Sequence, residues 1–485
     1  MNRRHLIVGA TATLVAVAPL TGAGSATAWP AGVTQSAAQP AHRVVVGPHG
    51  SDDAAGDAAH PLRTIAVAID RLGADGGTVL LRGGVYHQRV RLVARRHITV
   101  RPFPHEHPVL SGAGLRPPTG ARTGMVEIAR SRDIVVRGLE ITGYRTRKLN
   151  TVPVGVYVHG HDLNVRILRN HVHDLGNDNN TLGSFDINAH GVAAYGDDAN
   201  RPIRGLVIAR NQVDNLHLGA SESVVVNGNV TGWRITGNHI HDNDNIGIDA
   251  IGFEPTLPGK DRYTQRNRAR RGVIAGNVVQ RIRSQGNPAY WEDGSWCNCA
   301  DGIYIDGGSH LRVARNRVAD SDIGIEVAAE NPRGTADHVL VRRNRVTGSL
   351  FTGITTGGYC NGAKDCGGVR TGSSHDNVFT GNWLRGNNRL DDGSPELLVQ
   401  YYAYRNTFTH NTLIATNTGH VVYGTVPGGG SAGVPGKPAN RSDFNHFRAR
   451  GAGPGQLELG WRGRTYTGAR SYVTATRQDQ HSTFR

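Results

Sequence analysis

Three short segments of the chain place a carboxylate inside an otherwise apolar strand pattern. They read NIGIDAIG (245–252), DGIYIDGG (301–308) and DIGIEVAA (322–329). Side chains alternate between the two faces of a β-strand, so the isoleucines and valines are expected to point inward and the acids outward. Carboxyl groups gathered on one surface can transfer protons or hold a hard cation. Asp249, Asp306 and Glu326 are therefore the first candidates for chemistry.

These segments belong to a longer series that aligns on a recurring step, mostly Gly–Ile or Gly–Val. The first outward column of this series reads Tyr157, Ala193, Val225, Asp249, Tyr304, Glu326 and Thr355. The alignment puts Tyr304 between Asp249 and Glu326, with Asp306 one outward position further along the middle strand. Neighbouring strands lie about 4.8 Å apart, so the backbones of Asp249 and Glu326 are expected roughly 9–10 Å apart.

A second phrase recurs, in which a few strand residues are followed by Asn, one further residue, and Val, Ile or Leu. The repeated asparagines are Asn170, Asn211, Asn238, Asn277, Asn316, Asn344, Asn382 and Asn411. Successive members lie 27 to 41 residues apart. The shorter spacings suit one coil of a right-handed β-helix, and the longer ones suit a coil with an inserted loop. Stacked asparagines at such a turn are expected to satisfy one another's amides in a buried ladder.

The composition agrees with a β-rich, turn-rich chain. The 485 residues include 65 glycines and 54 Lys and Arg residues, of which four are lysines. Long amphipathic helices, which a Rossmann or barrel enzyme of this length needs, are absent from the pattern. The formal charge of +15 favours a polyanionic partner or reflects a coding preference for Arg over Lys. The arginines are scattered and no nucleic-acid-binding module is visible, so we expect no nucleic-acid partner.

The beginning of the chain predicts export. Residues 1–28 have a charged start with Arg3 and Arg4, an apolar middle and a small-residue end, typical of a signal peptide of twin-arginine or ordinary type. No other apolar run approaches spanning length, so a secreted protein without a membrane span is expected. Four cysteines, Cys297, Cys299, Cys360 and Cys366, are then expected in disulfides within loops, with the connectivity open.

The segment after the leader carries a helix between strands. Thr64–Leu72 is predicted as a short amphipathic helix with Ile65, Ala68, Ile69 and Leu72 on one face. Gly50-Ser51-Asp52, Pro61, Thr64-Ile65 and the stretch from Gly76 to Tyr86 match the opening phrase of a known group. In these residues the chain resembles secreted right-handed parallel β-helix proteins of the pectate-lyase-like superfamily. The resemblance implies an all-β, right-handed parallel β-helix solenoid with an N-terminal capping helix.

The predicted organisation has five parts. They are a signal peptide (1–28), a linker (29–43), an N-terminal cap and first coil (44–97), β-helix coils with inserted loops (98–424) and an irregular C-terminal coil (425–485). Insertions at 174–190, 196–204, 252–272 and 284–300 flank the acidic strands, and solenoid insertions tend to gather on a functional face. The 284–300 loop is rich in aromatic residues on which sugar rings could stack.

Proteins of this superfamily act on polysaccharides in several ways, so the resemblance leaves the activity open. Our first hypothesis is an extracellular glycoside hydrolase that needs no cofactor and acts as a monomer. Asp249 and Glu326 are the acid and base in either order, and Asp306 assists. The spacing suits an inverting glycosidase, whose carboxyls lie about 6.5–9.5 Å apart. The predicted substrate-binding residues are Tyr304, Trp291, Tyr195, His190, Glu222 and Lys260.

The second hypothesis is a Ca²⁺-dependent lyase acting on a uronic-acid polymer. Lyases of this superfamily hold Ca²⁺ with aspartates and use a Lys or Arg base. Lys260, which follows Asp249, is the best candidate for this base, with Arg262, Arg281 and Arg283 behind it. The metal ligands would then be Asp249, Asp301, Asp306 and Glu326. The third hypothesis is a glycan-binding β-helix without catalysis, which would not need converging acids.

Overall fold

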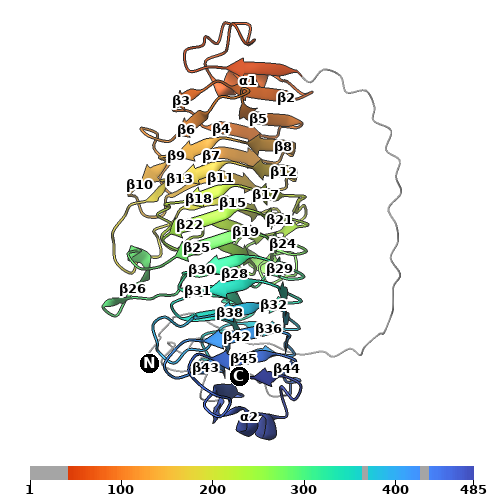
Figure 1. Cartoon of the computed structure of the whole chain (residues 1–485). Helices are drawn as coiled ribbons and strands as arrows, with labels where there is room; N and C mark the ends of the chain where they lie inside the picture. The colour runs from red at the N-terminus through yellow and green to blue at the C-terminus, as the bar shows by residue number, and fades with distance from the viewer. Residues whose placement is uncertain (1–41, 363–369, 426–435) are drawn as a thin grey trace.

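The computed structural model describes residues 42–362, 370–425 and 436–485. Its strands stack into a long column that runs from the N-terminal end at the top of Figure 1 to the C-terminal end at the bottom. The predicted signal peptide, Lys364 and Cys366 lie outside the described residues. The linker predicted for 29–43 lies largely outside them too, and its last residue begins strand β1.

Three long, mostly parallel sheets form the walls of the column. Sheet A consists of β1 (Arg43–Val46), β2 (Gly77–Leu81), β5 (Ile98–Pro102), β8 (Arg132–Arg137), β12 (Leu163–Leu168), β17 (Val207–Ala209), β21 (Arg234–Thr236), β24 (Val273–Ala275), β29 (Arg312–Ala314), β33 (Leu340–Arg342), β37 (Val378–Thr380), β41 (Thr407–Thr409) and β44 (Arg441–Asp443), with β16 (Ile203–Arg204) and β20 (Val230–Thr231) beside this path.

Sheet B consists of β3 (Gly84–Tyr86), β6 (Pro108–Ser111), β9 (Glu140–Thr142), β13 (His171–His173), β18 (Gln212–Asp214), β22 (His239–Asn243), β25 (Val278–Ile282), β30 (Arg317–Ala319), β34 (Arg345–Thr347), β38 (Trp383–Arg385), β42 (Thr412–Ala415), β45 (His446–Ala449) and β48 (Thr483–Phe484).

Sheet C consists of β4 (Val90–Val93), β7 (Arg122–Ala129), β11 (Val152–His159), β15 (His190–Gly196), β19 (Val224–Gly228), β23 (Ile248–Ile251), β28 (Asp301–Asp306), β31 (Ile323–Ala328), β35 (Thr352–Thr356), β39 (Leu397–Val399), β43 (Val421–Thr425), β46 (Glu458–Trp461) and β47 (Arg464–Thr467). Small sheets pair β10 (Arg145–Thr146) with β14 (Gly176–Asn177), β26 (Trp291–Glu292) with β27 (Ser295–Trp296), and β32 (Thr335–Asp337), β36 (Ser373–His375) and β40 (Ala403–Tyr404).

Each coil runs from sheet A to sheet B to sheet C and then returns to sheet A. The order β21, β22, β23, β24 shows one such turn of the solenoid. The structure thereby confirms the predicted right-handed parallel β-helix. The insertions at 174–190 and 284–300 connect sheet B to sheet C, whereas those at 196–204 and 252–272 connect sheet C to sheet A. Sheet C is therefore the sheet that the long loops border on both edges.

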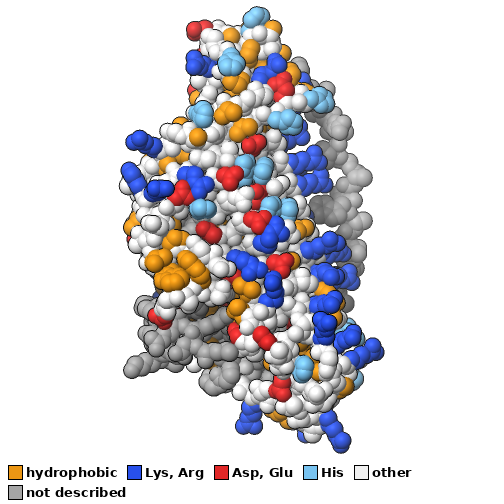
Figure 2. All heavy atoms as spheres, turned by 60° about the vertical axis from the view of Figure 1, so that its left-hand side comes forward, with side chains coloured by type: hydrophobic (Ala, Val, Ile, Leu, Met, Phe, Trp, Pro, Cys, Tyr) orange, Lys and Arg blue, Asp and Glu red, His pale blue; other side chains and the backbone are white. Residues whose placement is uncertain are grey.

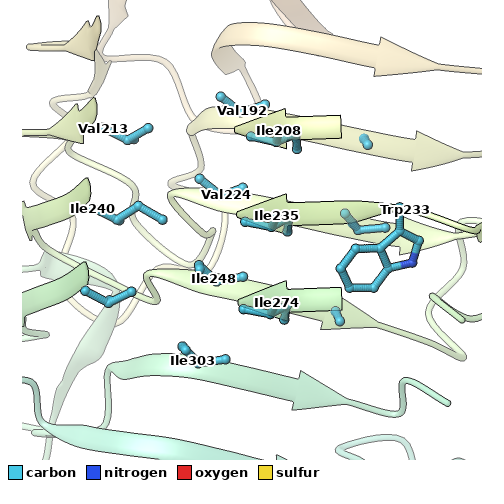
Figure 3. Close-up of a cluster of buried hydrophobic side chains, with 14 of the residues drawn as sticks. Val192, Ile208, Val213, Val224, Trp233, Ile235, Ile240, Ile248, Ile274 and Ile303 are labelled. Carbon is cyan, nitrogen blue, oxygen red and sulfur yellow. The ribbon is translucent and has the colours of Figure 1, made fainter. Parts of the chain in front are cut away.

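Columns of aliphatic side chains fill the interior. Figure 3 shows Ile208, Ile235 and Ile274 of sheet A stacked from coil to coil, opposite Val224 and Ile248 of sheet C. These side chains are fully buried, and each contributes about 1.5–3 kcal/mol relative to exposure. Because every coil repeats the same inward positions, the core is continuous along the column and sheets A and C face each other across it.

The predicted asparagine ladder is confirmed at the turn between sheets A and B. In each member the Nδ2 group donates to Oδ1 of the next asparagine, as between Asn238 and Asn277 at 3.0 Å. The backbone N–H of Asn238 donates to the same oxygen at 2.9 Å. The series extends one step past its predicted end, from Asn411 to Asn445. The residue before each asparagine adopts a left-handed conformation, with φ of 57° at Arg210 and 55° at Arg315.

The glycine of the Gly–Ile step has a packing reason at the entry of each sheet C strand. A Cβ on Gly302 would lie 2.4 Å from Cγ1 of Val318, and one on Gly324 would lie 2.3 Å from Cγ1 of Val346. A larger residue would therefore overlap the core at this corner. The recurring glycine marks the place where the chain turns into the strand that carries the acids.

Helices cover both ends of the column. Helix α1 (Ile65–Arg71) is capped by Thr64, and it buries Ile65, Ala68 and Ile69 against the first coils, as predicted. The C-terminal segment is more regular than the irregular coil expected from sequence. It completes a coil through β44, β45 and β46, and it ends in the hairpin β46–β47 and helix α2 (Ala469–Thr476). Among the described residues no helix is both long and apolar enough to cross a membrane.

Candidate active site on sheet C

The register of sheet C places the candidate acids on consecutive strands. Asp249 of β23 pairs with Tyr304 of β28, and Tyr304 pairs with Glu326 of β31. Tyr304 therefore stands between Asp249 and Glu326, in the order that the sequence alignment predicts. Asp306 lies two residues after Tyr304 on the same strand and pairs with Ala328.

Two more acids lie in a second outward column at the entry of the strands. Glu222 precedes Val224 by two residues, and Asp301 precedes Ile303 by two; both strands pair with β23. Glu222 and Asp301 therefore flank Ile246 on either side. Ile246 packs against Tyr304 and Ala328 to form a small apolar floor between the acids.

The acids are buried rather than solvated. Asp249 is only 1% exposed, and Asp301, Asp306, Glu326 and Glu222 are also buried. The Oδ1 atoms of Asp249 and Asp301 have no hydrogen-bond partner in the described part of the chain. Burying an unpaired carboxyl oxygen costs free energy, so such atoms call for a role other than folding.

Burial and mutual repulsion raise the pKa values of these acids. The pKa of Asp249 lies well above its ordinary range, first because of burial and then because of the charges of Glu222, Asp306 and Glu330. Burial, followed by the charge of Glu330, likewise raises the pKa of Asp306. Since the groups interact, their protons leave as a cluster rather than one residue at a time. Each protonation step therefore belongs to the cluster as a whole and not to a single carboxyl group.

Sequence reasoning missed two acids at this site, Glu254 and Glu330. Each follows an acid-bearing strand of sheet C at the corner where the chain leaves it. Asn227 Nδ2 donates to Glu254 Oε2 at 2.6 Å, and burial followed by the charge of Glu222 raises the Glu254 pKa. The Glu330 side chain is exposed at the surface of the cluster, but the surrounding protein and the charge of Glu254 raise its pKa to about 7.

Glu330 is also tied to Asp306 through its backbone. The Glu330 N–H donates to Asp306 Oδ1 at 2.7 Å. The Tyr304 and Tyr359 hydroxyl groups oppose the rise in the Glu330 pKa. The signal in the sequence is that DIGIEVAAE (322–330) ends in a second acid, four residues after Glu326.

Arg122, a further residue that sequence reasoning missed, begins a chain of contacts toward the acids. Its guanidinium carbon lies 3.7 Å from the ring centre of Tyr195. The Tyr195 hydroxyl lies 3.4 Å from His190 Nε2, and His190 Nδ1 lies 3.3 Å from Glu222 Oε2. A hollow of about 310 Å³ beside Arg122 and Tyr195 reaches Glu254. The predicted binding residues His190, Tyr195 and Glu222 therefore continue the acidic cluster toward the N-terminal coils.

The insertions 174–190 and 284–300 form an aromatic wall along one edge of sheet C. Phe185 and Tyr290 meet edge to face at 5.8 Å, and Asn245 Nδ2 donates to the Tyr290 hydroxyl at 3.3 Å. Burial, followed by the charge of Glu330, raises the pKa of Tyr290, which shows that this ring borders the acids. Trp291 packs on Trp296 at 4.7 Å, and no described contact joins it to the acids.

A disulfide between Cys297 and Cys299 lies at the end of this wall, just before β28. It constrains the chain where the aromatic hairpin enters the strand that carries Asp301 and Asp306. Cys360 is also disulfide-bonded, whereas Cys366 lies outside the described residues. Both observed cysteine linkages belong to connections between strands.

Lys260 lies away from this chemistry. It is exposed in the short helix η1 (Gly259–Asp261), and the contacts of the described residues do not join it to any acid of the site. The cations that act on Glu254 are Arg122 and Arg262, whose charges lower its pKa.

The predicted calcium ligands do not form a cation cage. Ca²⁺ takes 6–8 oxygens at about 2.3–2.6 Å, which brings its ligands close together. No three of Asp249, Asp301, Asp306 and Glu326 bring carboxyl oxygens within 4.8 Å of one another, a test that covers the described residues. The residues present therefore do not fit the ion.

Among the described residues, one cluster does bring three ligand atoms within 4.8 Å of one another: His310, Asp337 and His338. Its two imidazole rings stack with an angle of 9° and a separation of 4.6 Å, so their in-plane lone pairs run parallel instead of converging on one ion. Arg268 also holds the Asp337 carboxylate at 2.7 Å. This group is better described as a packed surface cluster.

The fold and site together define a parallel β-helix with a cluster of buried carboxyl groups on sheet C. No family model matches the chain. The chain is 33% identical over 443 residues to the uncharacterised protein YwoF of Bacillus subtilis (strain 168), covering 90% of this chain and 86% of that protein. The chain therefore belongs to the YwoF family.

Among solved structures, the chain is similar to the GH136 lacto-N-biosidase of Eubacterium ramulus, with 14% identity and a TM-score of 0.50. The match covers 77% of this chain and 64% of the length of that enzyme. The catalytic unit of a GH87 α-1,3-glucanase from Streptomyces thermodiastaticus matches with 14% identity and a TM-score of 0.46, over 88% of this chain and 71% of that one. The lacto-N-biosidase likeness agrees with the β-helix fold.

Proposed function

We propose that the chain is a glycoside hydrolase that cleaves a polysaccharide or oligosaccharide at the carboxyl cluster of sheet C, in a binding site that we call the acidic groove. The observation that carries the proposal is the placement of Asp249 and Glu326 two strands apart, on either side of Tyr304. Two strand spacings amount to roughly 9–10 Å between backbones, which suits a pair of carboxyls with a water molecule between the base and the sugar. The GH136 description of the similar structure agrees with this class, although that likeness concerns the fold.

In this proposal Asp249 is the general acid, because its raised pKa lets it hold a proton near neutral pH. It gives that proton to the glycosidic oxygen as the bond between this oxygen and the anomeric carbon breaks. Glu326 takes a proton from the water whose oxygen forms the new bond to that carbon. Asp306 stabilises the positive charge that develops on the sugar ring, and no cofactor takes part.

The remaining groups would hold the sugar. Tyr304 forms the floor between the two carboxyls, and Tyr290 borders the groove from the 284–300 loop. Aromatic rings stack on the apolar faces of sugar rings, and buried carboxyls accept hydrogen bonds from hydroxyl groups. His190, Tyr195 and Arg122 extend the groove for a substrate longer than two sugars. We further propose that the protein acts outside the cell as a monomer, after removal of the leader expected at 1–28.

The test is a polysaccharide and oligosaccharide panel with mass analysis of the products, run with and without EDTA. A hydrolase adds one water to each cleaved bond and ignores EDTA. Unsaturated uronic products that disappear with EDTA would identify a calcium-dependent lyase and overturn the proposal. Binding to a glycan with no product from any substrate would instead identify a binding protein.

Variants connect the activity to the groove. Asp249→Asn and Glu326→Gln are each expected to lower kcat by about 10²–10⁴-fold, which is the usual worth of a general acid or base. Glu140→Gln, on the outer face of sheet B, is the matched control and is expected to keep full activity. Full activity in both groove variants, with wild-type thermal stability, would rule out this pair as the acid and base.

A further inference from the structure

The outer face of sheet A carries a regular comb of arginines. Strand pairing places Arg166, Val207, Arg234, Val273, Arg312 and Leu340 in one column of successive coils. Arg166, Arg234 and Arg312 are exposed, and aliphatic side chains separate them. Since coils repeat about every 4.8 Å, these arginines recur roughly every 10 Å along the column.

A second row of arginines follows the adjacent turn. Arg169, Arg210, Arg315 and Arg343 each precede a ladder asparagine in the left-handed conformation, with φ between 52° and 57°. All four are exposed. The turn geometry repeats with every coil, so this row runs parallel to the comb.

Almost nothing on this face neutralises these charges. In the described strands of sheet A from β8 to β37, Asp133 is the one acidic residue. Its carboxylate already accepts a hydrogen bond from Asn164 Nδ2 and lies 3.3 Å from His97 Nδ1. Among the described residues, none of the comb or turn arginines forms an ion pair or a side-chain hydrogen bond. Figure 2 shows Lys and Arg side chains following one long edge of the molecule. The arginines repel one another, and a chain under pressure only to fold would intersperse acids.

The basic face and the acidic groove point in opposite directions. Sheets A and C face each other across the core, as the stacked side chains of Figure 3 show, so their outer faces look away from each other. The comb and the row of turn arginines therefore lie on the face opposite the acids of sheet C. A ligand on sheet A can remain bound while a different chain occupies sheet C.

We propose that sheet A binds an extended anionic polysaccharide and thereby anchors the protein to a polyanionic matrix. Guanidinium groups bind carboxylates through paired hydrogen bonds, and many weak contacts along a polymer release its counterions. Single-stranded nucleic acid is the poorer fit, because it needs aromatic side chains for base stacking and the positions between the arginines are Val, Ala, Thr and Leu. The choice of a polysaccharide as the ligand rests on the proposed function. The existence of the basic face is observed independently of that function.

The experiment measures binding to polygalacturonate at several salt concentrations, using the Asp249→Asn protein so that little polymer is cleaved during the measurement. Wild-type sheet A is expected to bind with an affinity that falls steeply as salt rises. A variant carrying Arg166→Glu, Arg234→Glu and Arg312→Glu is expected to lose at least about tenfold in affinity. The matched control reverses the exposed sheet B arginines Arg317, Arg385 and Arg448, and it is expected to lose less than threefold.

Equal losses in the two triple variants would show that only net charge matters, and they would overturn the proposal. Equal binding to DNA or to anionic vesicles, with the same sensitivity to the sheet A variant, would overturn the choice of polysaccharide. Thermal unfolding of both variants checks that they fold. Hydrolysis is measured in parallel on the wild type and on the sheet A variant, both with Asp249 intact. Absent hydrolysis in every protein with binding retained would overturn the proposed function alone.

Discussion

At the residue scale, the site is a group of carboxyls that control one another's protons. Burial is the largest cause of the raised pKa at Asp249, Asp301 and Asp306, and neighbouring acids add to it. Such crowding is costly for folding, and it is the arrangement that supplies a protonated acid beside an ionised base. Replacing one of these acids should therefore shift the pKa values of the others, even when the replaced acid does not contact the substrate.

Glu330→Gln tests this mutual control. The Glu330 charge raises the pKa of Asp306 and of Asp249, so its removal should lower both values. Since the general acid must be protonated, activity is lost as pH rises through its pKa. The basic limb of the kcat/KM profile is expected to move to lower pH by on the order of one unit. An unmoved limb in Glu330→Gln, with Glu140→Gln as control, would contradict this coupling.

The division of roles between Asp249 and Glu326 predicts a second difference. A substrate with a very good leaving group, such as an activated aryl glycoside of the sugar found in the panel, needs no protonation of its leaving oxygen. Asp249→Asn should therefore recover most of its lost activity on this substrate, whereas Glu326→Gln should stay slow. The reverse pattern in steady-state rates would exchange the acid and base roles.

Glu396 provides a stability test at a distance from the groove. It is fully buried, and burial raises its pKa to about 8 against hydrogen bonds from Asn387. The folded protein thus binds this proton more tightly than the unfolded chain, whose carboxyl titrates near 4.5. The contribution of Glu396 to the free energy of unfolding is fully present below pH 4.5 and is lost as the pH rises through 8. Between pH 5 and 9 the loss is expected to be on the order of a few kcal/mol.

Glu396→Gln cannot ionise and should flatten this pH dependence. Thermal unfolding midpoints of the wild type and the variant at pH 5, 7 and 9 measure the effect. A wild type that becomes more stable toward pH 9, or a variant with an unchanged slope, would show that Glu396 does not carry it.

At the element scale, the turn between sheets A and B is the best-determined part of the coil. Its left-handed residue is disfavoured for arginine, and the asparagine that follows offsets this strain through its hydrogen bonds. Asn277 accepts from the N–H and Nδ2 of Asn238, and its own Nδ2 donates to Ile235 O and Asn316 Oδ1. One side chain therefore satisfies polar groups of three coils.

Asn277→Ala should consequently lower the free energy of unfolding by more than the removal of one small side chain would suggest. It leaves the Asn238 donors and the Ile235 carbonyl buried without partners, at an expected cost of about 2–4 kcal/mol. Asn180→Ala, on an exposed loop position, is the control and should change stability by less than about 0.5 kcal/mol. Denaturant unfolding of the two variants measures the difference. Similar midpoints would show that the ladder contributes little.

The elements were predictable because their signals are local. The Asn phrase and the Gly–Ile step recur at fixed places in each coil, so the ladder and the order of Asp249, Tyr304 and Glu326 follow from alignment alone. Glu254 and Glu330 were missed because they follow the strands and reach the site by the direction in which the chain leaves the corner. The position of Lys260 could not be predicted for the same reason, since it depends on the path of a long insertion.

At the scale of the whole molecule, each coil packs mainly on its two neighbours. The stability of such a solenoid is roughly a sum of coil and interface contributions, and its ends need covers. Helix α1 provides the N-terminal cover by burying Ile65, Ala68 and Ile69. Damage to the cover should therefore stay near that end.

Ile69→Asn places a polar group in the first coils and tests this locality. Hydrogen exchange is expected to speed up in β1, β2 and β5, while β31, β35 and β39 keep wild-type protection. Ala66→Asn, an exposed position on the same helix, should leave all of these strands protected. Faster exchange along the entire column would mean that the solenoid opens as one unit.

The asparagine ladder also has an electrical direction. Every Nδ2 group donates toward the C-terminal end, from Asn170 through to Asn445, so the amide dipoles add along the axis and leave a partial positive charge at the last member. There Asn445 Nδ2 donates to the buried carboxylate of Asp479, which also accepts from Tyr472 and Ser482. The Asp479 carboxylate therefore balances the partial positive charge at the end of the ladder. Every coil offers the same amide donor on one side and the same amide acceptor on the other. Whole coils can therefore be inserted or deleted in evolution without leaving a ladder amide unpaired, provided that Asp479 still follows the last asparagine.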